Sequence, residues 1–502
     1  MSLVAYQKQF VLGPSPVAIR PDWLIVRIGE GLILSHCPKL RLQPLLSKDS
    51  VSYWLLGLAV RADEPMSSIS DGFRLKHSTE IENWTGYWAG RWLLITADRC
   101  IQDASGCFGI CYRRLGDDFW ISSSPALLGQ HLPGASSAPR LPWRVTHEKG
   151  MDWIPLPFTT REDVYRLLPL RALEPKTGLA TPVRFTTQAA NIREDAQALA
   201  FALKNIVTNW TQTDFRKRLT ALTAGLDTRT ILASGTAAGV QLEAFTMSLP
   251  ITPRRDLILP PRVASRAHVT HTFRRPKAVD TTEVDARMAA INEHMDGATF
   301  HPVAMHMARH NYEEMNARGQ SVAHGNSFGI GRCLFSAKLT NLGREIAPTD
   351  PDHILASFTF RSSWRPEPLA LWRGALQAWI ESLSDSLPLV LDWRDRFYLE
   401  QRLAGWNSTT QALWELLDST TFYPGNCLWI SDLFLGFSSE QRKVGFPQRE
   451  VIRILAPELL KIPVNPEPIS KVLRKRFRTF LGPKLVYWLK SLSQSSDPQR
   501  AR

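Results

Sequence analysis

Short apolar or alternating segments make up most of the first third of the chain. Clusters of Gly, Asp and Ser separate them, a pattern typical of β-strands joined by turns. The strands expected on this basis span residues 24–28, 51–59, 92–97, 108–113 and 119–122. A stretch rich in Pro and Gly follows at 132–157, and a last strand-like segment lies at 171–185. The pattern therefore predicts a β-rich N-terminal part.

The hydrophobic period changes near residue 190. Residues 192–211 carry apolar side chains at helical spacing after an acidic start, which predicts a helix. Strand and helix patterns then alternate, and such alternation indicates a parallel sheet with helices on both faces. The strands are expected at 217–222, 241–247 and 269–273, the helices at 229–235 and 262–268, and mostly helix from about 284 onward. We therefore predict two domains, 1–190 and 191–502, in an α/β protein.

Composition narrows the class of protein. The chain has 502 residues, of which 44% are hydrophobic and 21% charged, as in ordinary globular proteins. No uncharged apolar run reaches the roughly 18 residues that a membrane span needs. The N-terminus lacks the basic start, apolar core and cleavage site of a signal peptide, and the six cysteines are scattered, which is unlike a disulfide framework. We expect a cytoplasmic protein.

The net charge of +13 suits an acidic partner, nucleic acid or a phosphorylated ligand. Because the charge is mostly dispersed, an arginine-rich composition explains it equally well, and we expect no specific nucleic-acid binding. The exception is a basic and aromatic segment that begins at Lys471 and ends at Leu492. It fits at most peripheral contact with an anionic membrane or an acidic peptide, or else a solvated helix packed on the domain.

The most informative segment is a strand followed by a small-residue turn and a helix start. Backbone N–H groups converge at such a turn, and the helix dipole favours an anion there. Asp227 repels a bare phosphate, but it suits a polyphosphate that is bridged to it by Mg²⁺. The alternative is an ordinary turn with an aspartate cap. The residues of this loop are Leu222, Thr223, Ala224, Gly225, Leu226, Asp227, Thr228 and Arg229.

This loop resembles the pyrophosphate loop S-G-G-x-D-S-(R/S) of the asparagine-synthetase-like superfamily. Residues 88–98, followed by Asp103-Ala104-Ser105-Gly106, are similar to the G-x-(F/W)-x-x-x-x-x-D … D-x-x-G passage of that family. The resemblance implies a degenerate β-rich domain of the Ntn-hydrolase-like, glutaminase type, followed by a synthetase domain of the adenine-nucleotide α-hydrolase (ATP-pyrophosphatase) type. It implies ATP and Mg²⁺ as cofactors, with Asp227 as metal ligand and Met247 near adenine.

The second family motif, G-x-G-x-D, is matched in part at residues 324–332. Gly325 fits, whereas Gly329 stands where the family has an acid that helps to bind Mg²⁺. Either another carboxylate replaces this acid, or Asp227 and the nucleotide hold the metal alone, or activity is impaired. The alternative is a glycine-rich loop without any role in ligand binding.

The resemblance also implies catalytic residues in the C-terminal part. Residues 395–402 resemble the family helix that lines the acceptor pocket, with Tyr398 and Glu400 as candidates. Two residues apart on a helix they point about 200° from each other. The alternative for Glu400 is an ion pair with a nearby arginine. Lys461 is the candidate for stabilising charge on phosphate and oxyanion, with Lys443 and Lys471 as competitors.

Glutamine-dependent members of the family carry a cysteine at the mature N-terminus. Here Ser2 follows Met1, and the first cysteine is Cys37. The chain therefore resembles the branch that uses an amine of its substrate, the β-lactam synthetases and lasso-peptide cyclases. The resemblance implies ATP-dependent amide formation through an acyl-adenylate, with macrolactam closure of a ribosomal lasso-type peptide expected first and a precursor-maturation protease as a possible partner. A ligase that acts on a small-molecule carboxylate and amine, and a catalytically degenerate nucleotide- or partner-binding homologue, remain the alternatives.

Overall fold

The N-terminal part of the chain forms two antiparallel sheets. The computed structural model describes residues 3–143, 153–186, 192–296, 302–313, 317–335, 349–358 and 366–466. The first sheet, in the order β10-β8-β9-β1-β3-β2, contains β1 (Phe10–Gly13), β2 (Leu24–Gly29), β3 (Leu32–His36), β8 (Cys111–Leu115), β9 (Asp118–Ser122) and β10 (Tyr165–Arg166). The second, in the order β12-β11-β7-β6-β5-β4, contains β4 (Leu42–Leu46), β5 (Ser52–Arg61), β6 (Trp88–Ile95), β7 (Cys100–Gln102), β11 (Arg171–Leu173) and β12 (Ala180–Pro182).

The two sheets pack face to face because their strands alternate in side-chain direction. Leu56 and Leu93 of the second sheet share a core with Leu12 and Leu34 of the first. The neighbouring Leu55 turns to the outer face, where α1 (Ile69–Phe73) and α2 (Ser78–Thr85) cover it, while α3 (Pro125–Gln130) packs beyond the first sheet. The β-rich expectation is met, and the closer Ntn-hydrolase-like assignment stays a prediction.

The second part contains a five-stranded sheet in which all neighbours are parallel. Its order is β15-β14-β13-β18-β19, with β13 (Lys217–Ala221), β14 (Glu243–Met247), β15 (Thr270–Arg274), β18 (Gln320–Ala323) and β19 (Thr420–Phe422). Along the chain, β14 and then β15 are added on one side of β13, and β18 and then β19 are added on its other side. The strand order therefore reverses between β13 and β18, which makes the carboxyl ends of these strands the topological switch point.

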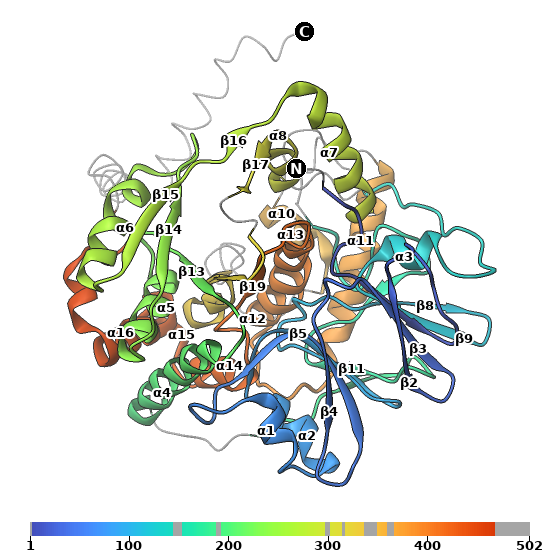
Figure 1. The fold of residues 1–502 in the computed structure, drawn as a ribbon, viewed down its shortest axis with the longest axis horizontal. Helices are drawn as coiled ribbons and strands as arrows, with labels where there is room; N and C mark the ends of the chain where they lie inside the picture. Colours follow the sequence, from blue (N-terminus) through green and yellow to red (C-terminus); the bar gives the residue numbers. More distant parts are fainter. Residues whose placement is uncertain are drawn as a thin grey trace.

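Helices cover both faces of this sheet (Figure 1). On one face lie α4 (Ile192–Thr211), α5 (Leu226–Ala237), α6 (Arg254–Arg266) and α16 (Phe446–Leu455), and on the other α7 (Thr281–His294), α8 (Pro302–Arg309) and α13 (Ser408–Trp414). The remaining elements are β16 (Lys277–Ala278), β17 (His310–Asn311), the 3₁₀ helices η2 (Asn326–Arg332), η4 (Ser382–Ser384) and η6 (Pro457–Lys461), α10 (Pro351–Phe358), α11 (Pro366–Glu381), α12 (Trp393–Phe397), the π-helix η5 (Tyr398–Asn407), α14 (Leu428–Leu435) and α15 (Ser439–Lys443).

The structure refines one sequence expectation and corrects another. The region after residue 284 is mostly helical, as expected, but the short strands β17, β18 and β19 also lie there, and strands of two to four residues give too short a pattern to detect. The segment 171–185 is not one strand but contains the hairpin β11–β12. The predicted domain boundary at residue 190 falls outside the described residues, between β12 and α4.

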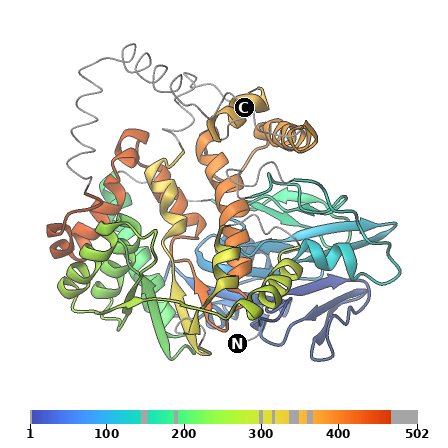
Figure 2. The same ribbon diagram turned by 90° about the horizontal axis from the view of Figure 1, so that it is seen from above.

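The two parts share one apolar core. Trp88 of the second sheet and Trp210 of α4 belong to the same buried cluster as Trp379. Asn426 crosses between the parts: its Nδ2 donates to the Gly90 carbonyl at 2.6 Å and to Asp103 Oδ1 at 2.7 Å. Figure 2 shows the helices of residues 393–414, in orange, between the parallel sheet and the antiparallel sheets. The site at the switch point is thus braced by the N-terminal part.

No helix in the described ranges is both long enough and apolar enough to cross a membrane. The basic segment from Lys471 to Leu492 lies outside these ranges.

The N-terminal segment is anchored on a buried histidine of the second part. His294 accepts a hydrogen bond from the Tyr6 backbone N–H at Nδ1 (3.0 Å) and donates one from Nε2 to the Ala412 carbonyl (2.6 Å). These two bonds require the neutral imidazole with its proton on Nε2. Burial lowers the pKa of His294 to about 4.

This histidine makes stability depend on pH. Below about pH 6.5 the unfolded chain binds a proton that the folded chain takes up only near pH 4, so the folded state loses stability as the pH falls. Between about pH 7.5 and about pH 5 the loss from this group amounts to about 2 kcal/mol. We expect His294→Gln to show a pH dependence of the urea-unfolding free energy that is smaller by this amount. The exposed His268, changed to Gln, serves as control and should keep the wild-type dependence; an unchanged dependence in His294→Gln would contradict the assignment.

Candidate functional site

Residues 222–225 of the loop join β13 to α5 at the switch point of the parallel sheet, and residues 226–229 of the loop form the first turn of α5. Gly225 is the N-cap of α5, and Asp227 lies in the first turn of that helix. Gly325 lies two residues after the end of β18, and a Cβ atom at Gly325 would lie 2.9 Å from Asp227 Cβ. The two motifs that the sequence singled out are therefore in contact, at the edge of the sheet where α/β proteins bind ligands.

The N–H groups of the loop have partners within the protein. Thr223 N–H donates to Thr228 Oγ1 at 3.1 Å, and Gly225 N–H donates to Thr223 Oγ1 at 3.2 Å. Ala224 N–H donates at 2.7 Å to Oδ1 of Asp256, which lies in the first turn of α6. An anion bound in this loop would have to replace these bonds or use the dipole of α5 beside them.

The C-terminal segment lies against the loop through Arg229. The guanidinium of Arg229 is fully buried and donates to the carbonyls of Leu459 (3.0 Å), Ile462 (2.6 Å) and Pro463 (3.1 Å). Asn465 N–H donates to the Ala224 carbonyl at 3.0 Å. The segment with the exposed Lys461 thus lies against the loop, while the role of Lys461 stays a prediction. Its competitor Lys443 is exposed beside Glu440, and Lys471 lies outside the described residues.

Asp227 is paired with an arginine. Arg332 Nη2, at the end of η2, lies 2.5 Å from Asp227 Oδ2. Asp227 Oδ1 and Arg332 Nε are both buried without a hydrogen-bond partner. Burial raises the pKa of Asp227 to about 6, although the Arg332 guanidinium acts in the opposite direction. The carboxylate is therefore held by a fixed positive charge.

The residues around Asp227 fit a Mg²⁺ ion poorly. The described part of the chain contains no group of three or more His, Cys, Asp or Glu side chains placed to hold a metal ion. A divalent cation on Asp227 would share the carboxylate with the Arg332 guanidinium. Like charges about 4 Å apart repel by about 4 kcal/mol per pair of unit charges at an effective dielectric constant near 20. Mg²⁺ at Asp227 stays a prediction from the resemblance, and we derive no step through it.

The structure gives a steric reason for Gly329. A Cβ atom at Gly329 would overlap the hydroxyl of Tyr398, which donates to the Asn326 carbonyl at 2.7 Å. Burial raises the pKa of Tyr398, and the charge of Asp227 acts in the same direction. Tyr398 therefore lies within the site and occupies the place that an acidic side chain at 329 would need.

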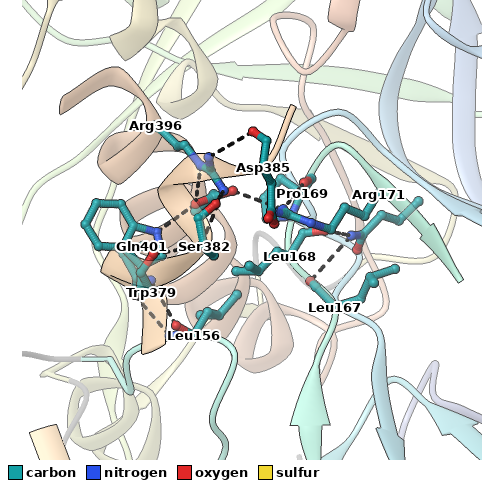
Figure 3. Close-up of polar contacts among 12 residues, drawn as sticks. Leu156, Leu167, Leu168, Pro169, Arg171, Trp379, Ser382, Asp385, Arg396 and Gln401 are labelled. Atoms are coloured by element: carbon teal, nitrogen blue, oxygen red, sulfur yellow. Dashed lines mark hydrogen bonds and ion pairs between the residues drawn. The ribbon is translucent and has the colours of Figure 1, made fainter. Parts of the chain in front are cut away.

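Glu400 points away from this place into a buried polar cluster. Its Oε1 accepts from Arg171 at 3.1 Å, and its Oε2 accepts from Trp379 Nε1 at 2.6 Å and from Arg396 at 3.1 Å. Figure 3 shows how these partners converge from separate segments. With no exposed surface and both oxygens engaged, Glu400 has the arginine pairing that the sequence left open as the alternative to a catalytic role. Tyr398 and Glu400 therefore lie on different sides of the π-helix η5, as their spacing in the sequence suggested.

Met247 ends β14 and lines a neighbouring pocket of about 350 Å³. Arg274, Lys277 and Tyr312 also line this pocket. It opens beside the carboxyl ends of β14 and β15, next to the strand that leads into the loop. This position suits the adenine contact predicted for Met247, which stays a prediction.

Sequence reasoning missed two residues of the site. Arg332 was part of the second motif, but nothing in the pattern indicated a partner 105 residues away. Asp256 lies outside the helix predicted at 262–268, because α6 begins earlier, at Arg254. One signal could have identified Asp256: it is an acidic residue at the start of the helix that follows β14, the strand next to β13. The first turns of α5 and α6 lie at the same edge of the sheet, so this side chain can reach the loop.

Comparisons with known proteins give little beyond this. No known protein-family model matches the sequence, and no curated protein matches it. Three of the solved structures found are a glutamine-dependent NAD⁺ synthetase from Acinetobacter baumannii in complex with ADP (18% identity, 33% of this chain and 31% of that chain, TM-score 0.19), an NH₃-dependent NAD synthetase from Campylobacter jejuni (12%, 40% and 100%, 0.20) and an NAD⁺ synthetase from Burkholderia pseudomallei (14%, 45% and 87%, 0.18). The chain thus spans less than a third of the length of the first. At TM-scores this low, the similarity establishes neither the fold nor the function of this chain.

The packing of Gly329 against Tyr398 can be tested by stability. We expect Gly329→Ala to lower the free energy of unfolding by about 2 kcal/mol, because the added methyl group overlaps the tyrosine ring. Combining it with Tyr398→Leu should reveal a coupling energy of about 1 kcal/mol or more in a double-mutant cycle. The control is Gly374→Ala in α11, where the added atom meets nothing within 4 Å and should leave stability equal or higher. Additive effects at 329 and 398 would show that the two residues do not compete for space.

Proposed function

We propose that this protein is an ATP-dependent ligase that forms an amide bond through an acyl-adenylate. A carboxylate of the substrate attacks the α-phosphate of ATP and releases pyrophosphate. An amine then attacks the acyl carbon, giving the amide, AMP and a proton. The observation that carries the proposal is the contact between the loop after β13 and Gly325 after β18 at the switch point of a parallel sheet.

The chain contributes position and charge to this reaction. The N-terminus of α5 presents a partial positive charge to a phosphate at the loop. Arg229 fixes the loop to the segment that carries Lys461, which provides a cation near the leaving pyrophosphate. Holding the carboxylate and the phosphate together supplies the orientation that a slow bimolecular reaction lacks.

The amine is proposed to come from the substrate and not from glutamine. All six cysteines are buried and form no disulfide, and burial raises the pKa of Cys107 and Cys111. A thiolate nucleophile, which a glutaminase needs, is therefore disfavoured at these positions. We propose a ribosomal precursor peptide as substrate, with macrolactam closure as the outcome and its maturation protease as a partner. The net charge of +13 suits such a peptide when it is acidic.

A catalytically degenerate homologue that binds a nucleotide or a protein partner is the second candidate. It is favoured by the Asp227–Arg332 pair and by the loop N–H groups, which already have partners. Such a protein would release no pyrophosphate from ATP with any carboxylate substrate.

The nucleotide site can be tested without knowledge of the substrate. We expect α,β-methylene-ATP to bind the wild-type chain in calorimetric titration with Mg²⁺ present. Gly225→Val should weaken binding by about tenfold or more, because its side chain would fill the space in front of the α5 N-terminus. Gly374→Val, in a helix interior remote from the loop, is the matched control. Failure of the wild-type chain to bind would rule out the nucleotide site.

Turnover is the second test. With an acidic precursor peptide and ATP, the wild-type chain should produce AMP, pyrophosphate and a peptide lighter by one water. Asp227→Ala should lower this rate by about a hundredfold, because the change removes the partner that fixes Arg332 in the site. The exposed Asp117, changed to Ala, should retain the wild-type rate. Equal rates in Asp227→Ala and wild type would remove Asp227 from the site.

A further inference from the structure

Arg332 occupies a place at the switch point for which the resemblance gave no residue. It ends η2, the helical turn that follows β18 and Gly325, and it reaches back to Asp227 on the first turn of α5. The segment that should carry an acid at 329 instead carries an arginine three residues later. Its charge is therefore opposite to the expected one.

The guanidinium has unused hydrogen-bonding capacity. Arginine has five N–H donors in a planar fork that matches the oxygens of a phosphate. Within the part of the chain that the structure describes, the Arg332 side chain forms one hydrogen bond, from Nη2 to Asp227 Oδ2 at 2.5 Å. Its Nε is buried without a partner, and its side chain is 29% exposed, so that the site can be reached from solvent.

The surroundings keep the guanidinium in place. Gly325 packs against Asp227 at the start of η2, and Tyr398 fills the space over Gly329 in its middle, so this short helix is held at two points along its length. Arg442, which lies in α15, donates from Nη1 to the Ile330 carbonyl at 2.9 Å. The arginine is thus presented by a buried turn and not by a free loop.

We propose that Arg332 neutralises the phosphate groups of the ligand bound at this loop, the task that the resemblance gives to a divalent cation on Asp227. Asp227 then orients Arg332 as a positioning residue and is not a metal ligand. The inference rests on the proposed nucleotide site, and it predicts that a nucleoside triphosphate binds without any divalent metal.

The test is calorimetric titration of α,β-methylene-ATP into the full chain, once with EDTA and once with Mg²⁺. We expect the wild-type Kd to differ by less than about threefold between the two buffers. Arg332→Ala should weaken binding in EDTA by about tenfold or more, as expected for loss of a hydrogen bond to a charged group, and Arg332→Lys should lose less. Asp227→Asn keeps an oxygen that can accept from Arg332, so its loss should be smaller than that of Arg332→Ala.

Arg453→Ala is the control, because it removes an exposed arginine from an ion pair on α16. Thermal unfolding of each variant shows whether the fold is intact. Binding by the wild-type chain only with Mg²⁺, or wild-type affinity in Arg332→Ala, would overturn the role of Arg332 and leave the nucleotide site standing. Absence of wild-type binding in both buffers would overturn the nucleotide site itself, and the role of Arg332 with it.

Discussion

The buried Arg229 guanidinium is the interaction on which the site depends. A charge removed from water costs several kcal/mol unless dipoles or an opposite charge replace its hydration, and in the described part of the chain no carboxylate forms an ion pair with Arg229. Backbone carbonyls at 459, 462 and 463 solvate it instead. Burial lowers the pKa of Arg229 to about 10, so it stays charged at neutral pH. The C-terminal segment therefore cannot leave the loop without exposing three carbonyls and stranding a charge, and the loop keeps its shape without a glycine-rich sequence.

The π-helix η5 carries the connection from the site to the antiparallel sheets. Tyr398 reaches the turn after β18, Glu400 binds Arg171 of β11, and Gln401 accepts from the Leu156 N–H at 3.0 Å. Three residues within one turn of this helix thus contact three parts of the molecule. A π-helix is rarely found over a length of ten residues, and here its wider turn separates neighbouring side chains that have different partners. The N-terminal part consequently supports the site mechanically.

Local pattern was enough to predict some features and not others. The helix expected at 192–211 has the bounds of α4, and the strand at 217–222 corresponds to β13, because each has a complete period of its own. The small-residue turn after β13 was likewise visible. The strands β18 and β19 were too short to show a period, and their place in the sheet depends on pairing with distant residues. The same holds for the pair Asp227–Arg332 and for Tyr398 over Gly329: each is a contact between distant segments, which one sequence does not reveal.

The position of β19 has a consequence for how the protein is made. This strand starts at Thr420 and pairs with β18 at the far edge of the sheet, whereas β13 ends at Ala221. Parallel pairings between distant segments form slowly, because loop closure must precede any gain from contact. On the ribosome the antiparallel sheets are complete long before the parallel one, so the half-built sheet exposes the edge of β18 until the C-terminal residues emerge. During that interval the exposed strand edge makes the nascent chain prone to aggregation.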